Sequence, residues 1–213
     1  MTNKVHQPEN DIMVETKGKL ELFFDKYGNK LLTGLGCITV IAIGFFLVSS
    51  IAENRNAKRE AMADAALAVA LNGEGVAEEF VAVVEEYGKT KAGNTAAYLA
   101  GAAYLEAGDM ENAKLYLEKY NNAKGVAGEI INALVLMLRG DLAVEQNDLQ
   151  SAEALYLESM ACSNDPVTYT EGAQKLALVY AAMGDEAKAE QCYKDIVAKY
   201  PEQARAYSKY ISK

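Results

Sequence analysis

Side chains that could support catalysis are few and scattered in this 213-residue sequence. Its only histidine, His6, lies in a polar N-terminal stretch, so the rest of the chain has no imidazole for acid–base chemistry. Acidic pairs such as Glu78-Glu79 and Glu85-Glu86 have neighbours at helical spacing, which favours a solvated helix face over a two-carboxylate site. We find no phosphate-binding glycine loop and no nucleophile elbow. We therefore expect no catalytic residue, cofactor or metal, and predict that the protein is not an enzyme.

The three cysteines do not suggest a reactive site either. Cys37 lies in a long apolar run, and Cys162 and Cys192 are 30 residues apart without the spacing typical of a metal site. Free, buried thiols are the simplest interpretation. A Cys162–Cys192 disulfide in an oxidising compartment stays open as an alternative.

Composition and charge predict the fold class and exclude one class of partner. The chain is 51% apolar, has only three prolines and is rich in Ala, Leu, Glu and Lys, which lose little freedom in a helix. We therefore predict an all-α fold. Residues 1–52 hold five basic and five acidic groups, so the net charge of −9 belongs entirely to residues 53–213. An acidic surface repels phosphate backbones, so nucleic-acid binding is not expected.

Residues 31–52 form an uncharged apolar run of 22 residues. As a helix it would span about 33 Å, enough for the hydrocarbon core of a bilayer. A cleaved signal peptide is disfavoured because the run is too long, although Ser50-Ile51-Ala52 resembles a cleavage site. A lipoprotein signal is disfavoured because Cys37 lies near the start of the run. A buried core helix would show a polar stripe, and this run has only scattered Thr and Ser. We predict a retained transmembrane helix over 31–52.

The length of each flank favours one topology. Lysines and arginines are nearly balanced on the two sides of the run, so charge decides little. A long C-terminal domain is translocated largely regardless of charge, so we predict a cytoplasmic tail over 1–30 and an extracytoplasmic domain over 53–213. Residues 20–31 look amphipathic. They would either lie at the cytoplasmic interface or extend the membrane helix, with a bend at Gly28-Asn29.

Three turn signals recur at near-regular spacing in the C-terminal part. They are Gly108-Asp109, Asn147-Asp148 and Gly184-Asp185, separated by 39 and 37 residues. Each is followed by an alanine and then by a larger residue on the same helix face. These residues are Ala113 and Leu117, Ala152 and Tyr156, and Ala189 and Tyr193. Before each turn, a small residue (Gly101, Gly140 or Ala177) marks a place where another backbone is expected to approach. The spacing predicts an internal helical repeat rather than an irregular bundle.

These positions resemble the tetratricopeptide repeat, a helix–turn–helix of about 34 residues. The last unit, from Thr170 to Pro201, is the best match; in the middle unit Arg139 and Ala143 replace an expected Leu and Tyr, so its packing is the least certain. Longer joints are expected at 121–128 and 164–166. Residues 58–90 would form a degenerate first hairpin, and 202–211 a capping helix. The predicted fold is thus a transmembrane helix followed by a tetratricopeptide-like solenoid.

What the resemblance implies for function is a groove lined by first-helix residues, suited to a helix or an extended peptide. Neighbouring helices or loops could instead cover some of these positions. Carried over to this sequence, the predicted protein-binding residues are Tyr98, Leu105, Glu106, Met137, Asp141, Glu145, Gln174 and Leu178. Apolar centres with an acidic rim would suit a partner with exposed apolar and basic residues.

The order of parts also resembles the YfgM-like family, ancillary subunits of the bacterial Sec translocon. The segment from Phe23-Phe24 through Gly28-Asn29-Lys30 is the most suggestive stretch. The resemblance implies a single-pass inner-membrane protein whose periplasmic domain meets translocon subunits, periplasmic chaperones or exported chains. The alternatives are a structural scaffold of an envelope complex, which would have one fixed partner, and an enzyme with an unrecognised site, which the lack of motifs disfavours.

Overall fold

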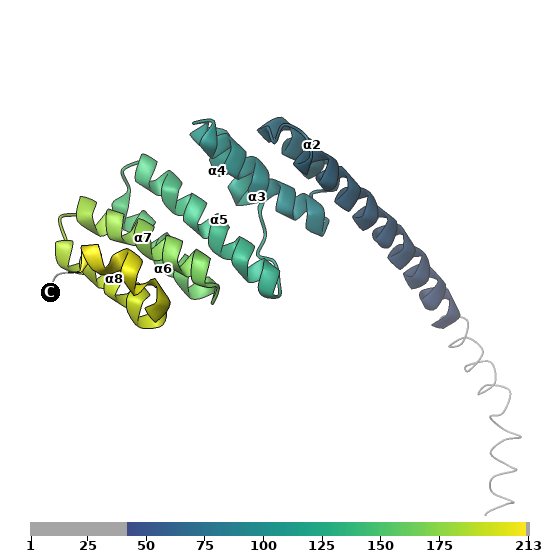
Figure 1. Ribbon diagram of the computed structural model, residues 1–213. Coiled ribbons are helices and arrows are strands. Elements are labelled where there is room, and N and C mark those ends of the chain that lie inside the picture. Colours follow the sequence, from purple (N-terminus) through teal and green to yellow (C-terminus); the bar gives the residue numbers. More distant parts are fainter. Residues whose placement is uncertain (1–41, 212–213) are drawn as a thin grey trace, which may run out of the picture. The chain divides into compact units, whose positions relative to one another are not determined.

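The computed structural model describes residues 42–211, which form helices joined by short turns and linkers (Figure 1). No β-strand occurs within that range. The all-α prediction is therefore confirmed for these residues. The chain divides into two compact units, residues 1–57 and 58–213.

In the first unit, the described residues 42–57 are helical. Their large apolar side chains face solvent: Phe45 is 75% exposed, Phe46 72% and Val48 68%. Among residues 42–211, no helix has the length and apolarity needed to cross a membrane. The predicted transmembrane helix at 31–52 lies half outside the described residues, and the amphipathic segment at 20–31 and Cys37 lie wholly outside them.

The second unit is a row of helical hairpins (Figure 1). Residues 58–71 are helical and precede α2 (Ala77–Tyr87). The three hairpins of the predicted repeats follow, and within each the two helices pack along each other. They are α3 (Lys91–Glu106) with α4 (Met110–Lys119), α5 (Val126–Glu145) with α6 (Leu149–Cys162), and α7 (Pro166–Ala182) with α8 (Glu186–Lys199). The predicted tetratricopeptide-like hairpins are thus present.

The three predicted turns share one geometry. Gly108, Asn147 and Gly184 have φ values of 80°, 58° and 81°, the left-handed conformation that ends a helix. The aspartate that follows each of them caps the next helix by accepting a hydrogen bond from the backbone N–H three residues on. Because these bonds are local, the same short sequence produces the same turn three times.

The small residues before the turns allow close packing inside each hairpin. A Cβ at Gly101 would lie 2.6 Å from Leu117 Cγ, and one at Gly140 would lie 2.5 Å from Tyr156 Cε1. The predicted close approach is present. What the glycines accommodate, however, is mainly a large side chain of the second helix rather than its backbone.

The joints between hairpins differ in detail from the prediction. Gly128 lies inside α5, so the first joint is shorter than predicted and part of the extra repeat length belongs to that 20-residue helix. Asn132, 7% exposed, fixes this joint: its Oδ1 accepts from Tyr120 Oη at 2.7 Å and from Ala123 N at 2.9 Å. Its Nδ2 donates to Ala123 O at 3.0 Å. The linker therefore has a defined conformation.

The core of the second unit forms two clusters. The first gathers α2, α3, α4 and part of α5 around residues such as Leu117 and Val135, and the second gathers α5 to α8 around Tyr156 and Leu176. Cys162 and Cys192 are both free, but only Cys192 is buried as predicted, and Cys162 is half-buried. Burial raises the pKa of the Cys192 thiol to about 11, so it stays protonated at neutral pH.

The C-terminal end closes over α8 with aromatic contacts. The predicted single capping helix is instead a series of short turns: a 3₁₀ turn at Pro201–Gln203, α9 (Ala204–Tyr207) and a 3₁₀ turn at Ser208–Tyr210. The Tyr193 ring stacks on Tyr207 at 6.0 Å and on Tyr210 at 4.5 Å between centroids. These rings cover part of the last helix, as a solenoid end requires.

Candidate protein-binding pocket

A pocket of about 390 Å³ opens where the three hairpins meet. Helices α3 to α7 all contribute to its wall, so the pocket does not exist in any single repeat. Most of the lining is apolar, and charged groups come from α5 and α7. Its residues are Leu105, Met110, Asp141, Val144, Glu145, Leu149, Tyr156, Lys175, Leu178, Val179 and Ala182.

An ion pair joins the two sides of the pocket. Lys175 Nζ on α7 lies 2.9 Å from Asp141 Oδ1 on α5, and both side chains are about one-quarter exposed. The same carboxylate accepts a hydrogen bond from Tyr156 Oη at 2.7 Å. Burial raises the pKa of Tyr156 well above its usual range, and the bond to the carboxylate raises it further. The phenol therefore remains a neutral donor that holds Asp141 in place.

The accessible part of the pocket is apolar with an acidic edge. Leu178 is 67% exposed and Val144 37%. Glu145 also lines the pocket, and Glu106 is exposed next to Leu105 on the chain. Neither glutamate forms an ion pair within residues 42–211. This arrangement can bind an apolar side chain and attract a cation.

Four of the eight predicted binding residues lie together in this pocket. They are Leu105, Asp141, Glu145 and Leu178, and they come from three different repeats. Glu106 is exposed close by in sequence. That these side chains touch a partner stays a prediction.

The other three predicted residues lie elsewhere. Met137 is only 2% exposed and belongs to the second core cluster, so it offers no surface. Gln174 Nε2 donates to Tyr207 Oη at 3.0 Å, which directs it toward the C-terminal turns. Tyr98 is half-buried against the first core cluster; burial raises the pKa of its phenol, and the negative charge of Glu171 raises it further. The groove assignment carried over from the repeat pattern therefore needs correction at Met137.

Two residues that shape the pocket were not predicted from the sequence. Lys175 supplies its cation, and Met110 extends its apolar wall from the start of α4. Lys175, Leu178 and Ala182 are spaced i, i+3 and i+7, so helical periodicity could have placed all three on one face. No comparable signal predicts the pairing of Lys175 with Asp141. Within residues 42–211, no group of three potential metal ligands occurs.

Comparison with known proteins supports the repeat assignment. Residues 173–202, from α7 to just beyond α8, match the family described as "Tetratricopeptide repeat". No curated protein matches the sequence. Two solved structures are similar. "Crystal structure of MamA protein" has a TM-score of 0.48 at 20% identity, covering 71% of this chain and 78% of that chain. "Crystal structure of MamA" has a TM-score of 0.44 at 23% identity, covering 61% and 74%. On the match of its last hairpin, the chain contains a tetratricopeptide repeat.

Proposed function

We propose that this protein is a membrane-anchored interaction module whose pocket between the hairpins binds a segment of another protein. The observation that carries the proposal is the 390 Å³ apolar pocket assembled from all three repeats. Repeat solenoids use surfaces of this kind to hold peptides or helices. The exposed leucine at 178 would contact an apolar side chain of the partner.

The charges around the pocket specify the partner further. Asp141 is already neutralised by Lys175, whereas Glu145 and Glu106 have no cation within ion-pair distance among the described residues. The partner segment would therefore be apolar and basic, with its cations near these two glutamates. Because both glutamates are exposed, they would act mainly on association rate and orientation.

A membrane anchor at 31–52 is part of the same proposal. Its support is the uncharged run of 22 residues and the exposed Phe45, Phe46 and Val48 within it. With residues 53–213 in the periplasm, the partner would be a translocon subunit, a chaperone or an exported chain, as the resemblance to the YfgM-like family implies. Protease added outside spheroplasts would then digest residues beyond Glu53, whereas full protection would contradict this topology.

Replacing one exposed pocket residue tests the binding site. Leu178→Asp places a charge in the pocket without disturbing the core, because Leu178 is 67% exposed. Leu157→Asp is the matched control, since Leu157 is 46% exposed on α6 and does not line the pocket. We expect partners to co-purify with Leu157→Asp and not with Leu178→Asp, while both keep their helical circular dichroism. Equal recovery with both variants would refute this site.

Crosslinking in cells distinguishes the possible partners. A photoreactive side chain at position 178 should capture translocon subunits, chaperones and many exported chains, and one at position 157 should not. A single dominant envelope protein captured from 178 would instead identify a dedicated scaffold. Crosslinks that do not depend on position would contradict both forms of the proposal.

A further inference from the structure

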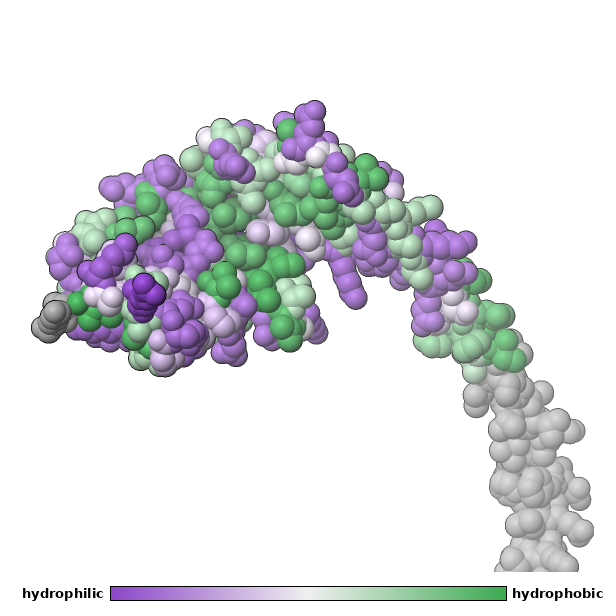
Figure 2. Space-filling model, in the orientation of Figure 1, coloured by the Kyte–Doolittle hydropathy of each residue, from purple (hydrophilic) through white to green (hydrophobic). Residues whose placement is uncertain are grey.

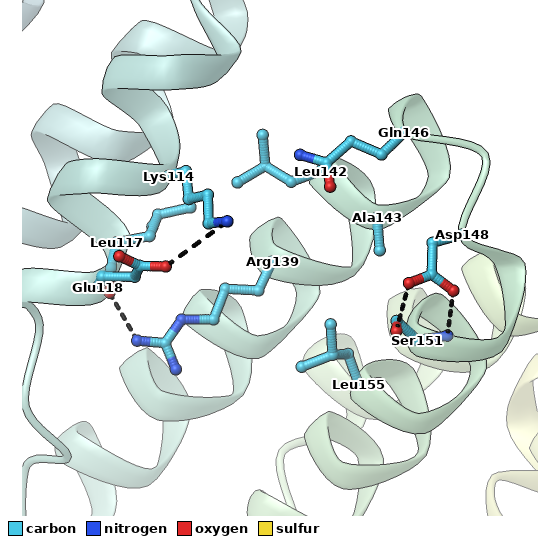
Figure 3. Close-up of a pocket in the computed structure, with 10 residues that line it drawn as sticks. All are labelled: Lys114, Leu117, Glu118, Arg139, Leu142, Ala143, Gln146, Asp148, Ser151 and Leu155. Carbon is cyan, nitrogen blue, oxygen red and sulfur yellow. Dashed lines mark hydrogen bonds and ion pairs between the residues drawn. The ribbon is translucent and has the colours of Figure 1, made fainter.

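A second pocket, of about 400 Å³, lies at the joint between the first and second hairpins (Figure 3). Its wall is made by α4, α5 and α6, and it shares no lining residue with the pocket described above. Its apolar wall consists of Leu155, which is half-buried, and of Leu117, Leu142 and Ala143, which are at most 7% exposed; the rest of the wall is polar or charged. The lining residues are Lys114, Leu117, Glu118, Arg139, Leu142, Ala143, Gln146, Asp148, Ser151 and Leu155.

The pocket coincides with a missing aromatic ring. Tyr104, Ala143 and Tyr180 occupy equivalent positions, because each carbonyl accepts the N–H of the capping aspartate that follows, at 2.8 Å. Tyr104 stacks on Tyr116 at 5.6 Å, and the Tyr180 hydroxyl reaches Glu153 on α6 at 2.8 Å. Ala143 provides neither contact. The volume that a tyrosine ring fills at the other two positions is therefore open at this joint.

Arg139 is the other residue of the middle repeat that departs from the repeat pattern, and it places a cation on the wall of this pocket. Arg139 lies one helical turn before Ala143, where the equivalent Leu176 is 2% exposed. Its Nη2 donates to Leu117 O at 2.6 Å, near the C-terminal end of α4. Its Nε is buried and has no hydrogen-bond partner, the only such side-chain atom within residues 42–211. An unpaired buried donor is costly, and more so on a charged group.

The carboxylates of the pocket do not neutralise Arg139. Glu118 lies 4.0 Å from Lys114 Nζ, and Asp148 accepts hydrogen bonds from Ser151 N at 3.1 Å and Ser151 Oγ at 2.6 Å (Figure 3). Neither lies within ion-pair distance of the guanidinium. Within residues 42–211, Arg139 thus has a backbone carbonyl but no carboxylate as a partner, in a chain with a net charge of −9.

We propose that the pocket between α4, α5 and α6 is a second binding site, which takes an acidic side chain flanked by a leucine-sized apolar group from a partner protein. The carboxylate would pair with Arg139, and the apolar group would fill the space beside Ala143. A carboxylate and a guanidinium form strong, directional hydrogen bonds when water is partly excluded. This site selects the opposite charge from the first pocket, so it does not depend on the function proposed above.

A small probe of the same chemistry tests the proposal directly. The probe is 4-methylpentanoate, which joins a leucine-like branch to a carboxylate, and 4-methylpentanamide is its uncharged control. In the full chain labelled with ¹⁵N-arginine, we expect the Nε signal of Arg139 to shift saturably with the carboxylate. The amide should bind about ten-fold more weakly, which corresponds to one charge-assisted hydrogen bond. An equal shift with both probes, or none with either, would overturn the proposal.

Two variants separate binding from a purely structural role of Arg139. Ala143→Tyr fills the pocket and leaves the guanidinium in place, while Arg139→Leu removes the charge and restores the residue type that the repeat pattern expects. Both should abolish carboxylate binding, followed on the backbone amide at position 143 in a uniformly ¹⁵N-labelled chain. Arg205→Gln, at an exposed arginine far along the sequence, should leave binding unchanged. Unaltered binding in Ala143→Tyr, with the helical fold retained, would show that the pocket is not the site.

Discussion

Single residues account for the regular turns between the helices of each hairpin. The left-handed residue stops one helix, and the aspartate side chain starts the next by satisfying a backbone N–H that has no partner within the helix. The backbone hydrogen bond from Asn112 is the main cause that lowers the pKa of Asp109. For Asp148 the main cause of the lowered pKa is the hydrogen bond from the Ser151 hydroxyl. Folding is therefore linked to the ionisation of these carboxylates.

This linkage predicts an acid-dependent loss of stability. A carboxyl group whose pKa is lowered by folding stabilises the protein above its unfolded pKa, and that contribution disappears as pH falls through the folded value. Below about pH 4 the melting temperature should therefore fall. It should fall less steeply in Asp109→Asn/Asp148→Asn, because asparagine still caps a helix but does not titrate in this range. Thermal melts between neutral and acidic pH measure the effect, and parallel curves for both proteins would contradict it.

A second prediction at the residue scale concerns the glycines under large side chains. Gly140→Ala should lower the free energy of unfolding by about 1–3 kcal/mol, because the new methyl would collide with the Tyr156 ring. Gly44→Ala is the control, since a Cβ there meets nothing within 4 Å and alanine favours a helix. Chemical denaturation measures the free energy of unfolding of both glycine variants. A destabilisation at Gly140 no greater than at Gly44 would show that Tyr156 moves aside freely.

At the scale of elements, the hairpins are similar and the joints between them are not. Helices α6 and α7 pack along each other across their joint, whereas α4 and α5 contact each other only slightly. The second joint is short, because Asp165 caps α7 directly before Pro166. The first joint depends instead on the buried Asn132 and on Arg139, which holds the end of α4. The second pocket, between α4, α5 and α6, also opens at this joint.

We predict that Asn132 is the most sensitive polar residue of this joint. Asn132→Asp keeps the shape but loses the donor to Ala123 O and places a charge in a 7% exposed position. It should destabilise the protein by about 2–3 kcal/mol or more. Asn121→Asp is an exposed control in the same linker. Amide exchange over residues 120–125 should rise in the first variant and not in the second; unchanged protection there would exclude this role.

At the scale of the second unit, each hairpin completes the core of its neighbour. Such a solenoid needs a covered last face. The rings of Tyr207 and Tyr210 provide that cover over Tyr193, and Gln174 is hydrogen-bonded to the same segment. In Figure 2, hydrophilic surface covers much of the C-terminal hairpins, while hydrophobic surface gathers over the first half of α5. Loss of the C-terminal turns would expose further apolar area.

Removal of residues 204–213 should therefore lower the melting temperature by several degrees and promote aggregation. The point variant Tyr207→Phe keeps the stacked ring and loses only the hydrogen bond from Gln174, so its effect should be small, about 1 kcal/mol. Calorimetry measures the melting temperatures of the truncated chain and of Tyr207→Phe, and light scattering measures their aggregation. If the truncated chain melts like the intact one, the aromatic contacts do not stabilise the end of the solenoid.

The sequence by itself determined the helical fold class and the position of the turn in each of the three repeats, because a left-handed residue followed by a capping aspartate acts through bonds only a few residues apart. Leu105 and Leu178, predicted from the repeat pattern as groove residues, both line the first pocket, and their contact with a partner stays a prediction. Only the tertiary structure decided that Met137 lies in the core, that Lys175 pairs with Asp141 and that Ala143 leaves a second pocket open. These outcomes depend on how each hairpin rotates against the next, which is set by contacts between residues far apart in the chain rather than by the pattern within one repeat.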